Sequence, residues 1–584
     1  MKRNKCRMNN MNSKITKRQL VGLALIICQL SFSMMLTSCA DLMDTDSELV
    51  EFQEDHQLQS PTDSVYSVMG IIYKLQTIAD RTVLLGELRG DLTTTTASAS
   101  KDLKAIASFN IDTDNAYNRI SDYYAVINNC NYFLAHIDKD LVKHDRKVFE
   151  SEYAAVKAYR AWTYLQLAQI YGQVPLVTEP LLTENASQAA MKQTPLDITA
   201  VCNYFIDDLK PYVDTKLPTY GNINSLNSQK FFIPVRALLG DLCLWAGRYQ
   251  EAAQYYHDFL ALRTNPVYTN LNHAFWDDAE KKEFRDARND FKFGADNAEC
   301  LCYIPMESSD FYGIRSELND IFNSTELNLR YAKVEPTKRL EQLSSISDYC
   351  YLSTNQDGSI DTLYAPKTNL EKNRYVGDLR FGTVYDYKNS GSKRFSRISS
   401  EEQTIDKFNS AGVTIYRTNM VYLRYAEALN RAGYPQSAFV VLKYGLYPTT
   451  VANYISDSER DAAGSLIEFD QTLFSTSNTQ GVHSRGAGRA DCDTLYALPQ
   501  PSMPLATYAD SVSYMMPLVE DMIVSEMALE GAFEGYRYYD LLRVALRRND
   551  PAYLADPICR RLGEADESLR SLLMDPQKWY LPLP

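Results

Sequence analysis

Residues 239–259 read LGDLCLWAGRYQEAAQYYHDF, and this stretch decides the fold class. Apolar residues on both sides of Gly247 recur at three- and four-residue steps, which predicts two amphipathic helices joined by a tight turn. Gly240 and Ala252 are small and lie twelve positions apart, where two antiparallel helices approach each other closely. Such a pair cannot bury its apolar faces alone, so it must stack on neighbouring pairs.

A second stretch, residues 417–446, repeats this arrangement. Ala426 and Ala438 are again twelve positions apart, and Gly433 marks the turn between them. The residues of both stretches fall at the offsets of tetratricopeptide repeats. The sequence therefore predicts an all-α dominated fold with a tetratricopeptide-like helical-repeat core, which is an α-α superhelix.

Helical periodicity extends this prediction to residues 118–172 and 196–262. The first of these regions is expected to end its second helix at Gly172, because a proline follows three residues later. Residues 448–520 contain few periodic apolar residues and are predicted to be rich in loops. The C-terminal part of the chain returns to a helical pattern.

Residues 265–415 interrupt the helix pairs. They are rich in aromatic residues, Asn, Asp and Gly, and Cys300–Ile304 resembles a short strand, so we expect a large, loop-rich and partly β insert. The sequence of residues 355–361 partly resembles a calcium-binding loop, but Ser353 and Tyr364 occupy the positions where that loop requires Asp and Glu. We expect a hairpin turn there, and we predict no metal site and no cofactor.

The first 38 residues are predicted to be a lipoprotein signal peptide. A basic region precedes the apolar run Leu20–Ile27, and small residues lead to Cys39, which is the order found in secretory signals. Residues 36–39, Leu-Thr-Ser-Cys, resemble a bacterial lipobox, in which the sulfur of the cysteine, here Cys39, receives the lipid. The alternative is an uncleaved anchor helix, but the run is shorter than the roughly 20 residues that a membrane span needs. Residues 39–60 are acidic and predict a flexible stalk.

Composition excludes some partners. The net charge is −14, and no basic cluster interleaves with aromatic residues, so nucleic acid is not an expected ligand. Tyrosine is abundant, with 41 residues, and its flat ring with a hydroxyl group suits sugars or peptides. The cysteines that follow Cys39 are scattered, which gives no zinc-site spacing and no indication of a disulfide framework.

Five motifs in order carry a family resemblance. Residues 155–177 (AVKAYRAWTYLQLAQIYGQVPLV), 377–380 (GDLR), 425–430 (YAEALN), 533–543 (FEGYRYYDLLR) and 580–584 (YLPLP) resemble segments of SusD/RagB-type outer-membrane nutrient-uptake lipoproteins. The resemblance extends over nearly the whole chain after the signal, so residues 61–584 are interpreted as one SusD-like helical-repeat domain. The Asn- and Pro-rich tail that usually follows the last motif is missing here.

The motif at 533–543 also has a direct physical interpretation. Its charged residues Glu534, Arg537, Asp540 and Arg543 step by three, so on a helix they can pair in a ladder. Arginine neighbours lower the pKa of a carboxyl group, whereas an acid catalyst needs a raised one. We therefore expect a structural motif and no catalytic residues.

The resemblance implies a shallow ligand platform built from N-terminal loops and the central insert. Aromatic rings would stack on sugar rings while polar groups bond the hydroxyls. The ligand-binding residues predicted in this way are Arg89, Asp91, Tyr117, Phe275, Trp276, Asp277, Tyr303, Phe311 and Tyr312. Trp276 is the best single candidate, because adjacent Phe and Trp residues are unfavourable to expose without use. The alternative is a hydrophobic cluster that only fixes the loop.

The resemblance further implies function, partner and location. It predicts a lipid-anchored, surface-exposed outer-membrane protein that binds nutrient oligomers and delivers them to a TonB-dependent SusC-like β-barrel transporter. Glycans are the expected ligands, but the residues do not distinguish a glycan from a peptide, as in a RagB-like uptake component. A helical-repeat scaffold for envelope assembly is the other alternative. No hydrolase motif is present, and the six histidines are dispersed, so we predict no enzyme.

Overall fold

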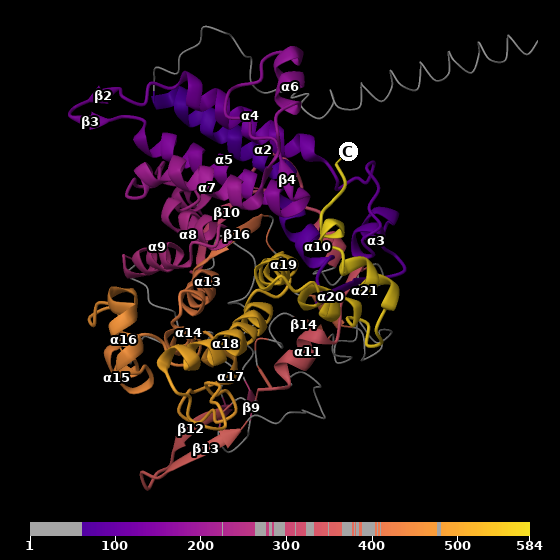
Figure 1. The fold of residues 1–584 in the computed structure, drawn as a ribbon. Coiled ribbons are helices and arrows are strands. Elements are labelled where there is room, and N and C mark those ends of the chain that lie inside the picture. The colour runs from indigo at the N-terminus through magenta and orange to yellow at the C-terminus, as the bar shows by residue number, and fades with distance from the viewer. Residues whose placement is uncertain are drawn as a thin grey trace, which may run out of the picture.

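The computed structural model shows a stack of helices with a β-containing insert (Figure 1). The residues that it describes are 61–224, 226–262, 276–278, 283–284, 298–309, 311–322, 332–347, 350–364, 377–378, 380, 385–387, 403–405, 407–408, 410, 412–475 and 480–583. The predicted signal peptide, Cys39 and the predicted stalk lie outside these residues. Among the described helices, none combines the length and the apolar character that crossing a bilayer requires.

Ten helices form the stack, and each packs on the next one in the series. They are α2 (Pro61–Glu87), α4 (Ile120–His136), α5 (Glu150–Tyr171), α7 (Ile198–Leu209), α8 (Val235–Trp245), α9 (Tyr249–Ala261), α13 (Thr418–Arg431), α14 (Pro435–Lys443), α18 (Tyr508–Glu530) and α19 (Arg537–Arg548). Figure 1 shows them running from the indigo N-terminal helices to the yellow C-terminal ones. The predicted fold class, an all-α helical-repeat architecture, is confirmed.

Helix α5 lies at the centre of the N-terminal half, between α4 and α7. It is buried on nearly all sides, because small residues such as Ala158 and Ala161 let its neighbours approach closely. The helix ends at Gly172, whose φ of 79° suits glycine. A Cβ at Gly172 would lie 3.0 Å from the ring of Tyr580, so the C-terminal segment closes over this helix end.

One buried pair of strands in the insert lies next to the helical core. Strand β10 (Cys300–Ile304) pairs antiparallel with β16 (Val413–Arg417), and α13 follows β16 directly. All residues of both strands are buried, so the ladder joins the insert to the helical core. Strand β12 (Cys350–Thr354) and β13 (Ile360–Tyr364) form a hairpin, which agrees with the turn expected in place of a calcium loop.

The prediction of loops over residues 448–520 is wrong in part. Four helices occur there: α15 (Pro448–Tyr454), α16 (Asp457–Ala463), α17 (Ser484–Ala487) and the first half of α18. Helix α18 begins at Tyr508, directly after its N-cap residue Thr507. The side chains of Thr507 and Asp510 form a capping box, and the helix continues through Pro517. An internal proline removes a hydrogen bond and usually ends a helix, so a helix that continues through Pro517 is not expected from the sequence.

Shorter elements complete the fold. The remaining helices are α3 (Lys101–Ala107), α6 (Glu184–Met191), α10 (Leu318–Phe322), α11 (Arg339–Ser344), α20 (Ala552–Cys559) and α21 (Glu567–Leu573). Short antiparallel pairs are β1 (Thr93–Thr95) with β11 (Val334–Pro336), β2 (Val142–Lys143) with β3 (Arg146–Lys147), β4 (Gln173–Val174) with β5 (Leu196–Asp197), β6 (Asn222–Ile223) with β7 (Leu226–Asn227), β8 (Trp276–Asp278) with β9 (Glu283–Phe284), and β14 (Tyr385–Tyr387) with β15 (Gln403–Ile405).

Candidate functional site

The loop between β10 and α10 presents Tyr312 to solvent. This side chain is 97% exposed, more than any other large apolar side chain among the described residues. Such exposure is unfavourable for a large ring unless a ligand uses it. We therefore take residues 305–309 and 311–317, named here the Tyr312 loop, as the candidate binding site.

Helix α2 holds the Tyr312 loop through Gln76. The side chain of Gln76 is 4% exposed, and its Nε2 donates to the carbonyl of Pro305 at 2.6 Å. Its Oε1 accepts from the backbone N–H of Ile314 at 3.0 Å. Gly313 has a φ of 138°, and a Cβ there would lie 2.0 Å from Gln76 Oε1, so only glycine allows this approach.

Asp80, one turn further along α2, fixes the end of the same loop. Its carboxylate accepts from the Ser316 hydroxyl at 2.7 Å and from the backbone N–H of Glu317 at 2.6 Å. Burial raises the pKa of Asp80, and these hydrogen bonds oppose that shift. The loop is therefore anchored at both ends on one rigid helix, which preorganises it for binding.

Polar side chains also belong to the Tyr312 loop or contact it. The Tyr117 hydroxyl donates to Glu317 at 3.2 Å, and Arg315, which is 70% exposed, pairs with Asp320 at 2.9 Å. The loop thus offers one flat apolar face beside a hydroxyl, a carboxylate and a guanidinium group. These groups can stack on a ligand ring and bond its polar atoms, and they contain no paired nucleophile and base.

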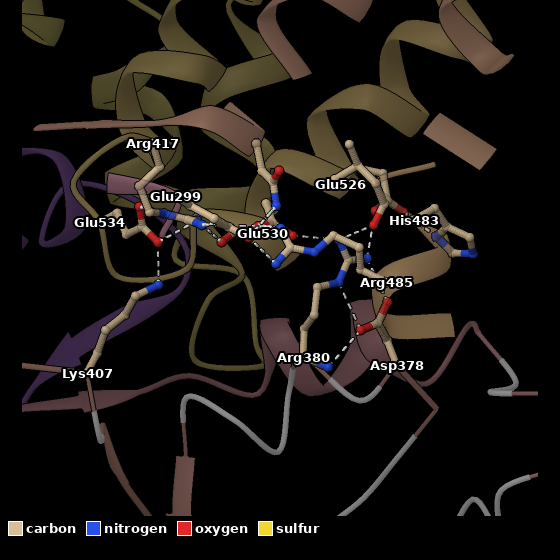
Figure 2. A network of polar contacts seen from close by, with 12 residues as sticks. Glu299, Asp378, Arg380, Lys407, Arg417, His483, Arg485, Glu526, Glu530 and Glu534 are labelled. Carbon is tan, nitrogen blue, oxygen red and sulfur yellow. Dashed lines mark hydrogen bonds and ion pairs between the residues drawn. The ribbon is translucent and has the colours of Figure 1, made fainter. Parts of the chain in front are cut away.

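A second cluster, the buried ion network, lies where the insert meets the C-terminal helices (Figure 2). Arg417 at the end of β16 donates to Glu299 at 2.7 Å, to Glu530 at 3.3 Å and to Glu534 at 2.8 Å. Lys407 donates to Glu534 at 2.5 Å. All these side chains are buried, so each charge needs its partner.

The other half of the buried ion network centres on Arg380. Its guanidinium donates to Asp378 at 2.7 Å, to Glu526 at 2.7 Å and to Glu530 at 3.3 Å. His483 lies 2.6 Å from Glu526 on its other side. Asp378 and Arg380, from one of the five motifs, therefore connect the insert to α18 through these hydrogen bonds.

The buried ion network pairs acidic with cationic side chains, and Asp493 extends it beyond His483. Its carboxylates are Glu299, Asp378, Glu526, Glu530 and Glu534, and its cationic groups are Arg380, Lys407, Arg417, Arg485 and His483. Burial alone would raise the pKa of Glu530, but Arg485, Arg417 and Arg380 lower it to about 2. A carboxyl group in that state holds no proton near neutral pH, so it cannot act as an acid catalyst.

Comparisons with known proteins agree with this architecture. Residues 46–202 match the family model SusD-like_3, described as "Starch-binding associating with outer membrane". A SusD-like carbohydrate-binding protein of Bacteroides fragilis NCTC 9343 has a similar structure, with a TM-score of 0.51, 16% identity, and coverage of 84% of this chain and 88% of that chain. The chain is thus similar to this family over residues 46–202 and shares the fold of the solved SusD-like protein over most of its length.

Two further solved structures share the SusD-like fold. A SusD superfamily protein of Bacteroides vulgatus ATCC 8482 gives a TM-score of 0.52 at 14% identity, with 88% of this chain and 96% of that chain covered. A SusD-like protein of Bacteroides fragilis NCTC 9343 gives 0.52 at 15% identity, with 86% and 89% covered. No curated protein matches the chain in sequence. The resemblance inferred from the five motifs is thus confirmed.

Two predicted platform residues of this SusD-like chain lie in its core, which corrects the prediction. Arg89 is fully buried, donates to Tyr539 at 3.1 Å and to the Trp579 carbonyl at 3.0 Å, and lies over the ring of Tyr538. Asp91 is also fully buried and accepts two hydrogen bonds from Arg537. Neither side chain is exposed at the surface as a platform residue would be.

The other predicted platform residues are divided. Tyr303 is buried in β10, with its hydroxyl 3.4 Å from Ser410, so this prediction is also corrected. Phe311 is half-buried, and its ring packs edge-on against the ring of Phe231, which connects the Tyr312 loop to the core. Tyr312 lies in the loop, and Tyr117 contacts its end through Glu317.

The segment with Trp276 is not tested. Phe275 lies outside the described residues, and Trp276 and Asp277 are described only as backbone in β8. Their role as ligand-binding residues stays a prediction.

The charged ladder predicted for the SusD-like signature is largely wrong. Glu534 precedes α19 and pairs with Arg417 and Lys407. Within the motif, Asp540 and Arg543 pair at 2.8 Å, and this is the only pair of that ladder among the described residues. The structural role is nevertheless apparent, because the remaining members bind partners from distant segments.

Sequence reasoning missed the residues that position the Tyr312 loop and the disulfide. Gln76 and Asp80 lie four apart on one helix, which is a signal only when the partner loop is known. Cys350 and Cys492 form a disulfide across 142 positions, a pairing that spacing does not reveal. Within the described residues, no group of three His, Cys, Asp or Glu side chains is placed to hold a metal ion.

Proposed function

We propose that this chain binds nutrient oligomers through the Tyr312 loop, with glycans as the ligand class. The observation that carries the proposal is the 97% exposed ring of Tyr312 on a loop fixed by Gln76 and Asp80. A solved relative described as a SusD-like carbohydrate-binding protein and a family described as starch-binding support the ligand class. Stacking of the ring on a sugar would be joined by hydrogen bonds from Tyr117, Arg315 and Glu317.

The proposal includes an anchor, a location and a partner. Lipid on Cys39 would hold the protein at the outer membrane, exposed at the cell surface. The description of the matching family as associating with the outer membrane supports this location. The bound oligomer would then pass to a TonB-dependent SusC-like β-barrel transporter. The chain would release its ligand unchanged, because capture by several weak contacts involves no bond cleavage.

Calorimetric titration of the purified protein against plant, host and microbial glycans and a peptide mixture tests this function. We expect saturable glycan binding, which Tyr312→Ala weakens by about tenfold through loss of the stacked ring. Trp276→Ala tests the second predicted aromatic residue in the same way. The matched control is Tyr514→Ala, which removes a 39% exposed tyrosine on α18, outside the loop.

Three outcomes would contradict the proposal. Binding of peptides without any glycan would favour the peptide-uptake alternative. Binding of an envelope protein alone would favour the scaffold alternative. Cleaved glycan recovered after the titration would indicate an enzyme.

A further inference from the structure

A large cavity lies where the end of α5, the turn between α8 and α9, helix α19 and residues 576–583 meet. Its volume is about 1160 Å³, and we name it the C-terminal groove after the segment that forms one wall. Pockets for single small molecules measure roughly 300 to 1,000 Å³, so this groove has room for a short oligomer. None of its lining residues belongs to the Tyr312 loop.

Two aromatic residues of the groove are held rigidly. Trp245 ends α8 and Tyr249 begins α9, so both line the groove at the same turn. Arg543 lies 5.3 Å from the centre of the Trp245 ring, and Arg547 lies 5.6 Å from that of Tyr249. Glu427 accepts from both guanidinium groups, at 2.6 and 2.8 Å. These cation–π contacts fix the rings before any ligand arrives, which lowers the entropy lost on binding.

The polar groups of the groove are mostly neutral. Exposed amide and hydroxyl groups line it, from Asn110, Gln173, Thr199 and Gln577. Asp197 and Lys578 contribute one charge of each sign. The arginines on the floor have protein partners, since Arg543 and Arg547 share Glu427 and Arg89 donates to Tyr539 and to backbone carbonyls. The neutral amide and hydroxyl groups suit the hydroxyl groups of an uncharged ligand.

We propose that the C-terminal groove is a second carbohydrate-binding site, which takes a neutral oligosaccharide by stacking sugar rings on Trp245 and Tyr249. Only the ligand class rests on the proposed function; the site itself is separate from the Tyr312 loop. Two sites on one chain hold a long polymer at two points, so the second contact forms at a high effective concentration. The protein would then retain a polymer more tightly than a single short oligosaccharide.

Titration of the purified protein with maltohexaose, cellohexaose, xylohexaose and mannohexaose tests the proposal, with hexagalacturonate as an acidic probe. We expect two sites per chain for at least one neutral hexasaccharide. Trp245→Ala should remove or weaken one site by about tenfold, Tyr312→Ala should affect only the other, and the double variant should lose both. Tyr249→Ala is the second groove variant if Trp245→Ala lowers the melting temperature, and Tyr204→Ala, a 39% exposed tyrosine on α7 outside the groove, is the matched control.

The outcomes separate the two proposals. A single site that Tyr312→Ala abolishes, with both groove variants binding as the wild type does, would overturn the groove and leave the proposed function intact. A single site that only the groove variants abolish would support the groove and overturn the Tyr312 loop. Preferential binding of hexagalacturonate would overturn the neutral ligand class. Failure of every hexasaccharide to bind would overturn the groove, while the wider glycan panel still decides the Tyr312 loop.

Discussion

At the scale of single residues, His483 has an unusual charge state for a buried imidazole. Burial alone would lower its pKa, but Glu526 and Asp493 raise it to about 9. Nδ1 lies 2.6 Å from Glu526 and Nε2 lies 3.1 Å from Asp493, while the ring stacks on Tyr496 at 3.6 Å and Arg380 acts against the shift. The imidazole is therefore a cation in the folded protein at neutral pH.

This charge state predicts a pH-dependent effect of His483→Gln. Because the folded pKa is above the ordinary value of 6.5, the stabilisation is fully present below pH 6.5 and is lost as the pH rises through about 9. The variant should be less stable than the wild type by about 3 kcal/mol at pH 6, and this difference should shrink towards pH 10. Urea unfolding of both proteins at each pH measures it. A difference that stays constant from pH 6 to 10 would contradict the assigned charge state.

The charged signature residues show which features the sequence could predict. Their spacing correctly placed Asp540 and Arg543 in contact on one helix, because partners three positions apart are neighbours there. Arg537 instead binds Asp91, and Arg543 also binds Glu427, over sequence distances that no local pattern encodes. Most of the partners of these residues therefore depend on tertiary packing.

At the scale of elements, the backbone of α2 at Gly86 packs closely against the backbone of the turn at Gly535. A Cβ on Gly86 would lie 1.8 Å from the carbonyl oxygen of Gly535, which is backbone and cannot move aside. Gly86→Ala should therefore destabilise the protein by about 3 kcal/mol. Gly70→Ala on the same helix meets nothing within 4 Å and should be neutral or stabilising by up to about 1 kcal/mol.

Denaturant unfolding of the two alanine variants makes this comparison within one helix. Equal stability of Gly86→Ala and the wild type would mean that α2 and the turn do not pack as described.

The disulfide between Cys350 and Cys492 ties the β12–β13 hairpin to the segment before α18. Closing a loop of 142 residues restricts the unfolded chain, so the double variant Cys350→Ser, Cys492→Ser should lose about 2 to 5 kcal/mol of stability. Thermal unfolding with and without a reductant measures this. The reductant should lower the Tm of the wild type and leave that of the double variant unchanged. Cys559→Ala, which changes a free cysteine, is the control and should still respond to the reductant.

Elements were predictable where one helix carries its own signal. The pair α8 and α9 was evident from Gly247 and the apolar steps around it, because the break and the periodicity are local. Helix α18 was missed because Pro517 interrupts its pattern. The pairing of β10 with β16 was also out of reach, since more than a hundred residues separate the strands and short strands carry little periodicity.

At the scale of the whole molecule, buried carboxylates set the acid limit of stability. Burial alone would raise the pKa values of Glu427, Glu526 and Glu530, but neighbouring arginines, and His483 for Glu526, lower each to about 2. Because these values are below the ordinary 4.5, the stabilisation is present above pH 4.5 and is lost as the pH falls towards 2. We expect little change in Tm from pH 7 to 5 and cooperative acid unfolding between pH 4 and 2.

Circular dichroism during acid titration measures this transition. The variant Glu427→Gln removes one of the three ionised carboxylates, so it should be less stable at pH 7 and should depend less on pH between 4.5 and 2. A wild-type Tm that stays unchanged down to pH 2 would contradict the lowered pKa values.

The fold of the whole chain was more predictable than the site. Repeat offsets and five ordered motifs determine which helices exist and in what order, and the architecture follows from stacking them. The exposure of a side chain does not follow from the local sequence in the same way. Arg89 and Tyr312 both suit a ligand platform by residue type, yet Arg89 is fully buried and Tyr312 is 97% exposed. That difference depends on the packing of the insert against α2, which no single segment determines.

The buried ion network also has a consequence for the order in which the chain is made. The cations Arg380, Lys407, Arg417 and Arg485 leave the ribosome before Glu526, Glu530 and Glu534, and the earlier carboxylates Glu299 and Asp378 balance only two of these four charges. Until the last tenth of the polypeptide emerges, closing the middle of the molecule would bury unbalanced cations, which is strongly unfavourable. The nascent chain would thus stay open almost to the end of its synthesis, which is the condition that a polypeptide needs if it is to cross a membrane before it folds.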